Sequence, residues 1–228
     1  MARRVPRLRT KEPSPDKYHR RSISGFGDVI LVDVNVPWCP TRLPCDPTDS
    51  AFAQQGVDVL IEAMHLLRLT GVTAHLYMIG QGSLKGFLER KICAYSLTDT
   101  VFLRENIPTA TLRGYLQQCD CLVIPSRRDS IPLVFSEGLQ AKIPMIVSAT
   151  GDLATLVQKF DLGYVIPPGD PVQLKQALAD FTRNRYPRKK ESPAFDEAKA
   201  LFSLSRATAD FLHQVEKILH RSSASRAC

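Results

Sequence analysis

The chain has 228 residues, of which 44% are hydrophobic, so it is long and apolar enough to build one large packed domain with appendages. Its formal net charge of +7 is concentrated at the start, because residues 1–22 hold eight basic and two acidic residues. That start lacks the apolar stretch of a secretory signal, and no apolar run approaches the length of about 18 residues that a membrane span needs. A cytoplasmic protein is therefore expected.

The predicted elements alternate along the chain after a basic leader of residues 1–27, which is expected to be disordered. Apolar runs predict strands over 28–34, 74–80, 100–103, 121–126, 144–149 and 163–167. Helical spacing of apolar residues predicts helices over 57–71, 83–97, 109–119, 133–142, 152–160 and 170–185, and a last helical stretch over 193–220 that is broken near 202–205. Between the first strand and the first helix lies a proline-rich loop.

Cap residues support several of these boundaries. Ser83 and Asp170 are suited to N-cap their helices, Pro171 fits a first helical turn, and Gly71 fits a C-cap. The strands are continuous apolar runs, which is typical of a parallel sheet covered on both faces by helices. The expected fold is α/β, with about six parallel strands in a Rossmann-like domain over residues 28–190 and a C-terminal helical segment over 191–228.

The six cysteines lack the spacing of a zinc site and are interpreted as buried free thiols. Cys119 and Cys121 flank Asp120 at the expected start of a strand, so alternation predicts that both lie on one face. No metal ligands are identified.

Ligands of open parallel sheets bind outside the carboxyl ends of the strands, so the loops that follow strands are the candidate site. One of them, "GQGS" over residues 80–83, has two glycines before a helix and is either a plain turn or a contact with a phosphate or sugar. It lacks the GxGxxG pattern of a dinucleotide site.

The segment "SRRDSIPLVFSE" over residues 126–137 is richer in chemical groups. Ser130 is suited to cap the helix that begins near Pro132, and the first amides of that helix would favour an anion such as a diphosphate. Asp129 and Glu137 lie on either side, and a carboxylate can accept hydrogen bonds from paired hydroxyls. The alternative is that Asp129 is an extra cap and Glu137 a solvated helix residue.

This segment resembles the donor-binding, C-terminal domain of the GT-B glycosyltransferases of family 4, the "glycosyl transferases group 1" domain, in which an acid, seven residues and a glutamate recur. Here Asp129 stands in the place of the first glutamate. The pieces "GVDVLIEAMHLL", "AHLYMIGQGSLKGFLERK", "LRGYLQQCDCLVIPS" and "SATGDLATLVQKFDLGYVIPPGDPVQLKQAL" follow in the order of that family, over about residues 56–185.

The resemblance implies a nucleotide-diphosphate sugar as donor substrate, retention of anomeric configuration and no metal. It places Asp129 on the transferred sugar and Glu137 on the ribose, as the residues closest to catalysis. The further donor-binding residues that it implies are Gly80, Gln81, Gly82, Leu103, Arg104, Glu105, Ser126, Arg128, Ser130, Ile131, Pro132, Leu133 and Val134.

Two departures from the family pattern bear on activity. In the family, two basic residues neutralise the diphosphate, and this chain has Asn35 and Gln55 at those positions. Arg42, Arg127 and Arg128 are substitutes to consider. The acceptor-binding domain of a GT-B enzyme normally precedes the donor domain, and residues 1–55 are too few to form it. The expected partner is therefore a separate acceptor-binding domain or subunit.

Three hypotheses follow. The first is a glycosyltransferase donor module, and the second is a non-catalytic nucleotide-sugar-binding subunit or an inactive remnant. The third, which is weaker, is a nucleic-acid-binding domain that uses the leader; its affinity would fall steeply with salt and disappear on deletion of residues 1–22. A leader that contacts anionic phospholipid at the inner membrane face is a further interpretation of the same charges. The sequence does not identify the base, the sugar or the acceptor.

Overall fold

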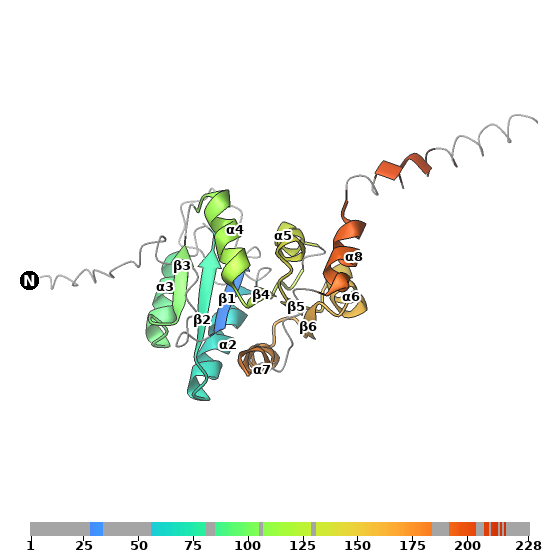
Figure 1. Cartoon of the computed structure of the whole chain (residues 1–228). Helices are drawn as coiled ribbons and strands as arrows, with labels where there is room; N and C mark the ends of the chain where they lie inside the picture. Colours follow the sequence, from blue (N-terminus) through green and yellow to red (C-terminus); the bar gives the residue numbers. More distant parts are fainter. Residues whose placement is uncertain are drawn as a thin grey trace, which may run out of the picture.

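The computed structural model describes residues 28–33, 56–80, 85–104, 107–128, 131–183 and 192–203, together with 208, 209, 211–213, 215 and 217 (Figure 1). The leader, the proline-rich loop with Asn35, Arg42 and Gln55, and the predicted cap Ser83 lie outside these ranges. The interpretations that depend on them stay predictions.

The described elements agree closely with the predicted ones in type and order. The strands are β1 (Asp28–Asp33), β2 (Ala74–Ile79), β3 (Val101–Arg104), β4 (Cys121–Ile124), β5 (Met145–Ser148) and β6 (Gly163–Ile166). The helices are α2 (Val57–Leu69), α3 (Lys85–Ala94), α4 (Thr109–Gln118), α5 (Leu133–Ala141), α6 (Gly151–Lys159), α7 (Pro171–Thr182) and α8 (Pro193–Leu201). The predicted break of the last helical stretch is confirmed, since α8 ends at its C-cap Phe202.

The strands form one sheet in the order β3-β2-β1-β4-β5-β6, and every neighbouring pair is parallel. The strand β1 therefore lies inside the sheet, with β2 and then β3 on one side of it and β4, β5 and β6 on the other. This reversal between β1 and β4 is where open parallel sheets hold their ligands, at the carboxyl ends of the strands. The predicted α/β fold with six parallel strands is confirmed.

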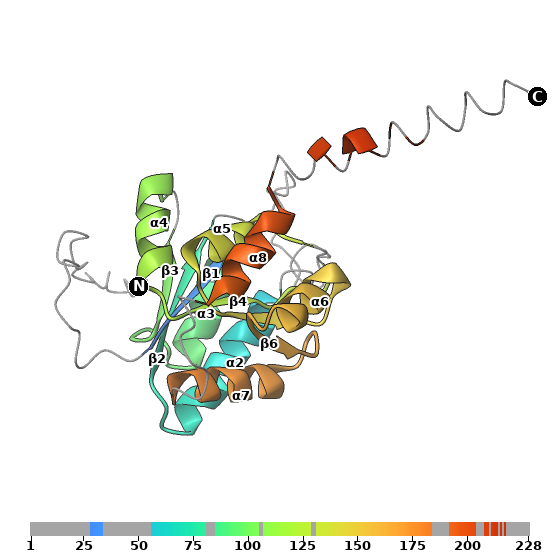
Figure 2. The same cartoon turned by 45° about the vertical axis from the view of Figure 1, so that its right-hand side comes forward.

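Two apolar layers cover the sheet, as Figures 1 and 2 show from two directions. On one face, α2, α3 and α7 pack through a core that includes Leu60, Leu88 and Leu178. On the other face, α4, α5, α6 and α8 pack through a core that includes Phe135 and Phe195. The helix α8 thus belongs to the same core as the sheet.

The cysteines do not follow the predicted arrangement. The strand β4 starts at Cys121, while Cys119 is the C-cap residue of α4. Their side chains consequently lie in opposite layers, Cys119 with α4 and α5 and Cys121 with α2 and α7, so the prediction of one shared face is wrong. Neither cysteine forms a disulfide and both are buried as expected, whereas Cys93 is exposed.

The helix ends follow the predicted chemistry at α7, where the Asp170 carboxylate accepts hydrogen bonds from the amides of Val172 (2.9 Å) and Gln173 (3.0 Å). After α2, Gly71 takes a φ of 76° one residue beyond the C-cap Thr70.

The start of α5 differs from the prediction. Pro132 does not lie in the first turn but is itself the N-cap, because its ψ of 154° is extended, and its own side chain makes no cap hydrogen bond. The predicted cap Ser130 lies outside the described residues.

One glycine joins the first helix to the carboxyl edge of the sheet. Gly56, the N-cap of α2, has a φ of 67°, and a Cβ atom at this position would overlap the carbonyl oxygen of Pro125, the residue that follows β4. The backbone of α2 therefore touches the backbone after β4 directly. This close approach fixes where α2 begins relative to the loop that leads into α5.

We predict that Gly56→Ala destabilises the fold by about 2–5 kcal/mol, since a left-handed φ and a backbone overlap are combined at this position. Gly71→Ala is the matched control: Gly71 also has a positive φ, but a Cβ there would meet no atom within 4 Å, so it should cost only about 1–2 kcal/mol. Urea unfolding of the two variants measures the difference. Equal losses for both would show that the contact with Pro125 is unimportant.

Candidate functional site

The candidate site is the carboxyl edge of the sheet around the switch between β1 and β4. The structure brings to this edge Gly80 after β2, Leu103 and Arg104 at the end of β3, Ser126 and Arg128 after β4, and Ile131, Pro132, Leu133 and Val134 at the start of α5. Glu137 lies one turn further along α5. Asp129, Ser130, Gln81, Gly82 and Glu105 lie outside the described residues, so their predicted roles stay predictions.

The residues at the ends of β2 and β3 are partly engaged by the sheet itself. The Gly80 amide donates to the carbonyl of Arg104 at 3.0 Å, which extends the ladder between the two strands. The Arg104 guanidinium donates to the Leu103 carbonyl at 3.2 Å and lies over the Phe102 ring, 5.7 Å from its centroid. Because the Gly80 amide is already bonded, this glycine would border a ligand without donating to it.

The start of α5 presents backbone donors at this edge. The Phe135 amide donates to the carbonyl of Pro132 at 3.0 Å, while helix geometry leaves the amides of Leu133 and Val134 without an acceptor inside the helix. The Val134 side chain is buried, but those of Ile131 and Leu133 are exposed by 38% and 78%. Free amides beside apolar side chains suit an anion whose charge is spread over several oxygens.

Glu137 is not the solvated helix residue of the alternative interpretation. Its side chain is half-buried, and burial raises the pKa of its carboxyl above the ordinary value, an effect that the charge of Arg113 on α4 partly offsets. No described residue forms a hydrogen bond or ion pair with this carboxyl. A partly desolvated carboxylate without a described partner is suited to accept hydrogen bonds from a ligand.

Arg127, considered above as a substitute for the basic residues of the diphosphate site, has another partner. Its guanidinium donates to both carboxylate oxygens of Asp58, at 3.1 and 2.8 Å, and both side chains are less than a third exposed. Asp58 lies in the first turn of α2, so this pair ties the loop after β4 to that helix. Of the two arginines, Arg128 is the exposed one.

Two hydroxyls at this edge were missed by the sequence reasoning. Ser148 ends β5 and Thr150 is the N-cap of α6, and the buried Oγ of the first and Oγ1 of the second have no hydrogen-bond partner. The only signal in the sequence is a serine and a threonine directly after an apolar strand. That pattern is common in turns, so it carries little weight by itself.

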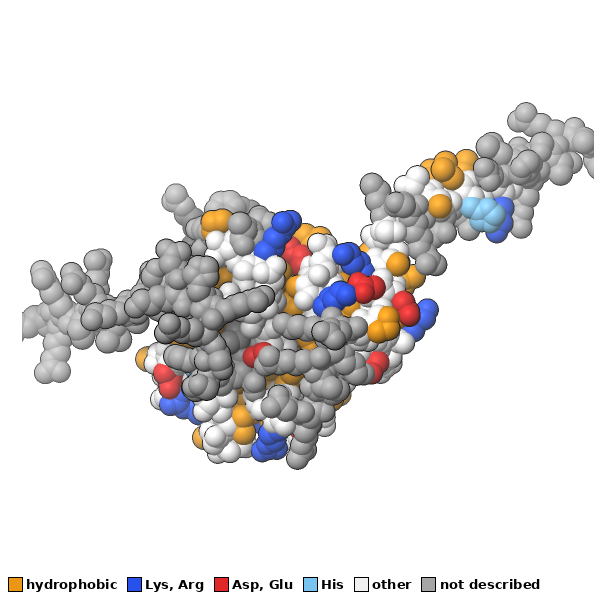
Figure 3. Space-filling view, in the orientation of Figure 1, with side chains coloured by type: hydrophobic (Ala, Val, Ile, Leu, Met, Phe, Trp, Pro, Cys, Tyr) orange, Lys and Arg blue, Asp and Glu red, His pale blue; other side chains and the backbone are white. Residues whose placement is uncertain are grey.

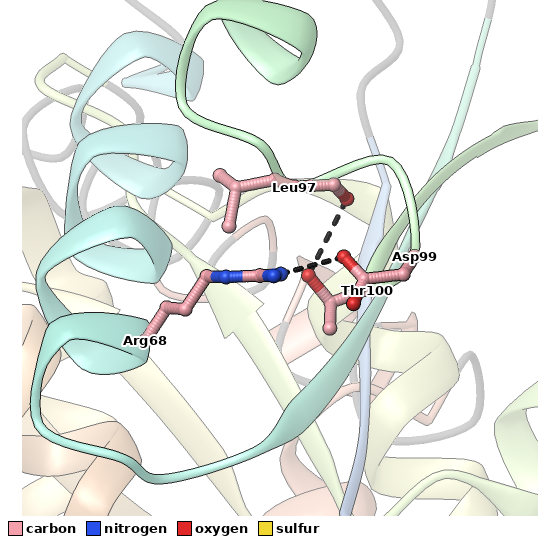
Figure 4. A network of polar contacts seen from close by, with 4 residues as sticks. All are labelled: Arg68, Leu97, Asp99 and Thr100. Carbon is pink, nitrogen blue, oxygen red and sulfur yellow. Dashed lines mark hydrogen bonds and ion pairs between the residues drawn. The ribbon is translucent and has the colours of Figure 1, made fainter.

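A hollow lies at the opposite, amino edge of the sheet. It is a cavity of about 220 Å³ between the end of α2 and the starts of β2 and β3. The Arg68 guanidinium donates to Asp99 at 2.6 Å there and lowers the pKa of that carboxyl, and the Thr100 hydroxyl donates to the Leu97 carbonyl at 3.3 Å (Figure 4). Its polar groups are paired with one another, unlike Glu137 at the carboxyl edge.

The face of the molecule in Figure 3 carries charges of both signs. Basic and acidic side chains are mixed over α5, α6 and α8 on the face in Figure 3. Within the part of the chain that the structure describes, there is no group of three potential metal ligands and no helix with the length and apolarity to cross a membrane. The expected absence of a metal stays a prediction.

Comparison with known proteins identifies the class. The sequence profile of the family described as "Glycosyl transferases group 1" matches residues 50–199, about two thirds of the chain. The chain belongs to this family, which confirms the resemblance stated above; the finer assignment to family 4 stays a prediction.

Individual relatives show how much of a longer protein the chain corresponds to. The colanic acid biosynthesis glycosyltransferase WcaL of Salmonella typhimurium, itself described as putative, is 26% identical over 136 residues, which cover 57% of this chain and 34% of WcaL. The chain thus spans about a third of the length of the curated relatives that it matches.

Solved structures share the fold at lower identity. The C-terminal domain of a glycosyl transferase group 1 family protein from Francisella tularensis is 16% identical with a TM-score of 0.59, and the match covers 78% of this chain and 87% of that domain. HepE of Anabaena, crystallised in complex with UDP, is 15% identical with a TM-score of 0.61, and the match covers 84% of this chain and 49% of HepE.

We predict that Glu137→Gln removes a pH dependence of stability. Because burial raises the native pKa of Glu137, the native state holds this proton more tightly than the unfolded chain does, so wild type loses stability as the pH rises from 4.5 through the raised native pKa. The glutamine variant should therefore be the more stable protein at neutral pH, and the difference should vanish below pH 4.5.

Thermal unfolding of both proteins between pH 4 and 8 measures this effect. A glutamine variant that is less stable than wild type at neutral pH would contradict the assignment, since it would mean that the ionised carboxylate has a stabilising partner in the ligand-free protein.

Proposed function

We propose that this chain is the donor-binding module of a glycosyltransferase and binds a nucleotide-diphosphate sugar at the carboxyl edge of its sheet. The observation that carries the proposal is the half-buried Glu137 carboxyl, which lies on the helix α5 that starts at this edge and has no described partner. Family membership supports the reaction class, and the crystallisation of HepE with UDP makes this nucleotide an obvious first ligand to test.

Glu137 would accept hydrogen bonds from the two ribose hydroxyls. A carboxylate has two oxygens, so it can accept from two vicinal hydroxyls at once, and the ribose of a nucleotide presents such a pair. These bonds favour the ionised form, whereas burial favours the neutral form. Nucleotide binding would therefore lower the pKa of Glu137 and weaken as the pH falls below its raised value.

The diphosphate would lie against the start of α5. The amides of Leu133 and Val134 are free of intrahelical acceptors, and the helix dipole places partial positive charge at this end. During transfer the bond between the sugar and the diphosphate breaks, and negative charge grows on the leaving group. Fixed donors aimed at that charge stabilise the transition state without a metal.

Asp129 would contact the transferred sugar, and backbone near Leu103, Arg104 and Glu105 would hold the base. Transfer with retention of anomeric configuration also needs an acceptor site. A second domain, in this polypeptide or in a partner, would supply it across the carboxyl edge.

The second candidate function is a non-catalytic nucleotide-sugar-binding subunit or an inactive relative. The Arg127–Asp58 ion pair favours it, because it directs one of the nearby guanidinium groups to α2 while Asn35 and Gln55 stand at the usual basic positions. A donor site that depends on amides alone would lose several kcal/mol of transition-state stabilisation relative to one with basic side chains. The non-catalytic subunit would bind the donor and fail to transfer its sugar, whereas the inactive relative would not bind it.

We predict that Glu137→Ala weakens the affinity for UDP or GDP, whichever the wild type binds, by on the order of 100-fold or more, since two hydrogen bonds to a charged group are lost. Calorimetric titration of the 228-residue chain with both nucleotides and their sugars measures it. Glu62→Ala removes an exposed glutamate from α2 and is the matched control, which should bind as wild type does.

The fold of each variant is checked by its circular dichroism spectrum. Unchanged nucleotide affinity in the Glu137→Ala variant would show that the ribose assignment is wrong. No binding of any sugar nucleotide by wild type would instead support the inactive relative.

A further inference from the structure

The turn between β5 and α6 holds two hydroxyl groups that the proposed donor contacts do not use. Ser148 is 1% exposed, and its Oγ and the Thr150 Oγ1 are both buried without a hydrogen-bond partner among the described residues. Buried polar atoms are nearly always bonded, and leaving one unbonded costs about 1–3 kcal/mol. Two such atoms within three residues call for an explanation.

The Thr150 hydroxyl also lacks the hydrogen bond that its position at the start of α6 would usually provide. Thr150 occupies the N-cap of this helix with extended backbone, where a threonine side chain usually accepts from an amide of the first turn, yet it caps nothing. The N-caps of the next two helices do cap them: Asp170 accepts from Val172 and Gln173, and Ser192 accepts from Ala194 at 3.3 Å. The turn after β5 therefore leaves both hydroxyls and the first amides of α6 available.

The position of this turn is next to the proposed donor site. Ile124 of β4 pairs with Val147 of β5, so Ser148 lies beside Pro125, about 4.8 Å away across the sheet. Pro125 begins the loop that leads to Arg127, Arg128 and the start of α5. The hydroxyls thus stand one strand beyond the loop that would hold the diphosphate and the transferred sugar.

The local chemistry favours a neutral, hydroxyl-rich ligand over an anion. A hydroxyl donates one hydrogen bond and accepts others, which matches the hydroxyls of a sugar ring. The first turn of α6 carries an acid, Asp152, and residues 148–153 include no basic side chain. A phosphate placed here would face a carboxylate with no countercharge from this turn.

We propose that Ser148 and Thr150, with the start of α6, form a subsite for the transferred sugar of the donor and select among sugars by their hydroxyls. This inference rests on the proposed function and extends it, because it assigns a second group of contacts, at the end of β5 and the start of α6, in addition to those of Glu137 on α5. Binding of the sugar supplies the partners that the two hydroxyls lack in the free protein.

The test compares Ser148→Ala and Thr150→Val with wild type in calorimetric titrations with UDP, UDP-glucose, GDP and GDP-mannose. Each variant should bind the sugar nucleotide about 3- to 10-fold more weakly, the effect of one lost hydrogen bond, and bind the nucleoside diphosphate as wild type does. Both ligand-free variants should also unfold at the same or a higher temperature than wild type, since each loses an unpaired buried hydroxyl.

Thr100→Val is the matched control. The Thr100 hydroxyl is also buried, but it donates to the Leu97 carbonyl at the amino edge. This variant should lose stability and keep its affinity for every ligand, which is the signature of a structural hydroxyl.

Four outcomes would overturn the inference. Loss of stability with unchanged affinity would mean that a water or the protein satisfies these hydroxyls, and an equal loss for the nucleoside diphosphate and the sugar nucleotide would place them on the diphosphate or nucleoside. If wild type binds the nucleoside diphosphate and the sugar nucleotide with equal affinity, the subsite proposal fails while the proposed function stands. If wild type binds neither ligand, the proposed function and the subsite proposal both fail.

Discussion

The parallel sheet constrains everything that the site can be. Because all six described strands run in the same direction, their carboxyl ends meet at one edge, and every helix that follows a strand starts there with amides that have no acceptor inside the helix. The order β3-β2-β1-β4-β5-β6 then sets two such starts side by side, that of α2 after β1 and that of α5 after β4. The Gly56–Pro125 contact and the Arg127–Asp58 pair join the start of α2 to the loop that leads into α5.

Backbone amides contribute positive potential at this edge, together with the guanidinium groups of Arg104 and Arg128. The described carboxylate with the raised pKa, Glu137, is partly desolvated on α5, and the Arg127 guanidinium is bonded to Asp58. A diphosphate bound there would meet oriented amides whose positions are fixed by the helix. Such donors do not have to reorganise when charge develops on a leaving group, although each contributes less than a full positive charge would.

Much of the fold could be predicted from the sequence, because continuous apolar strands, helical spacing and the Asp170–Pro171 start of α7 are local signals. The predictions failed where the answer depended on position in space. The faces of Cys119 and Cys121 depend on where α4 ends, and the role of Pro132 depends on a ψ that no residue type dictates. In the same way, the Arg127–Asp58 pair joins residues 69 positions apart, and the unbonded hydroxyls of Ser148 and Thr150 emerge only when all neighbours are known.

The Arg127–Asp58 pair has a consequence for how the site would meet its ligand. Arg127 stands two positions before Asp129 in the loop between β4 and α5, and its two hydrogen bonds anchor that end of the loop to α2. Conformational freedom of the anchored backbone is therefore lost when the chain folds instead of when the ligand arrives. A preorganised loop of this kind raises affinity without adding a single contact to the ligand.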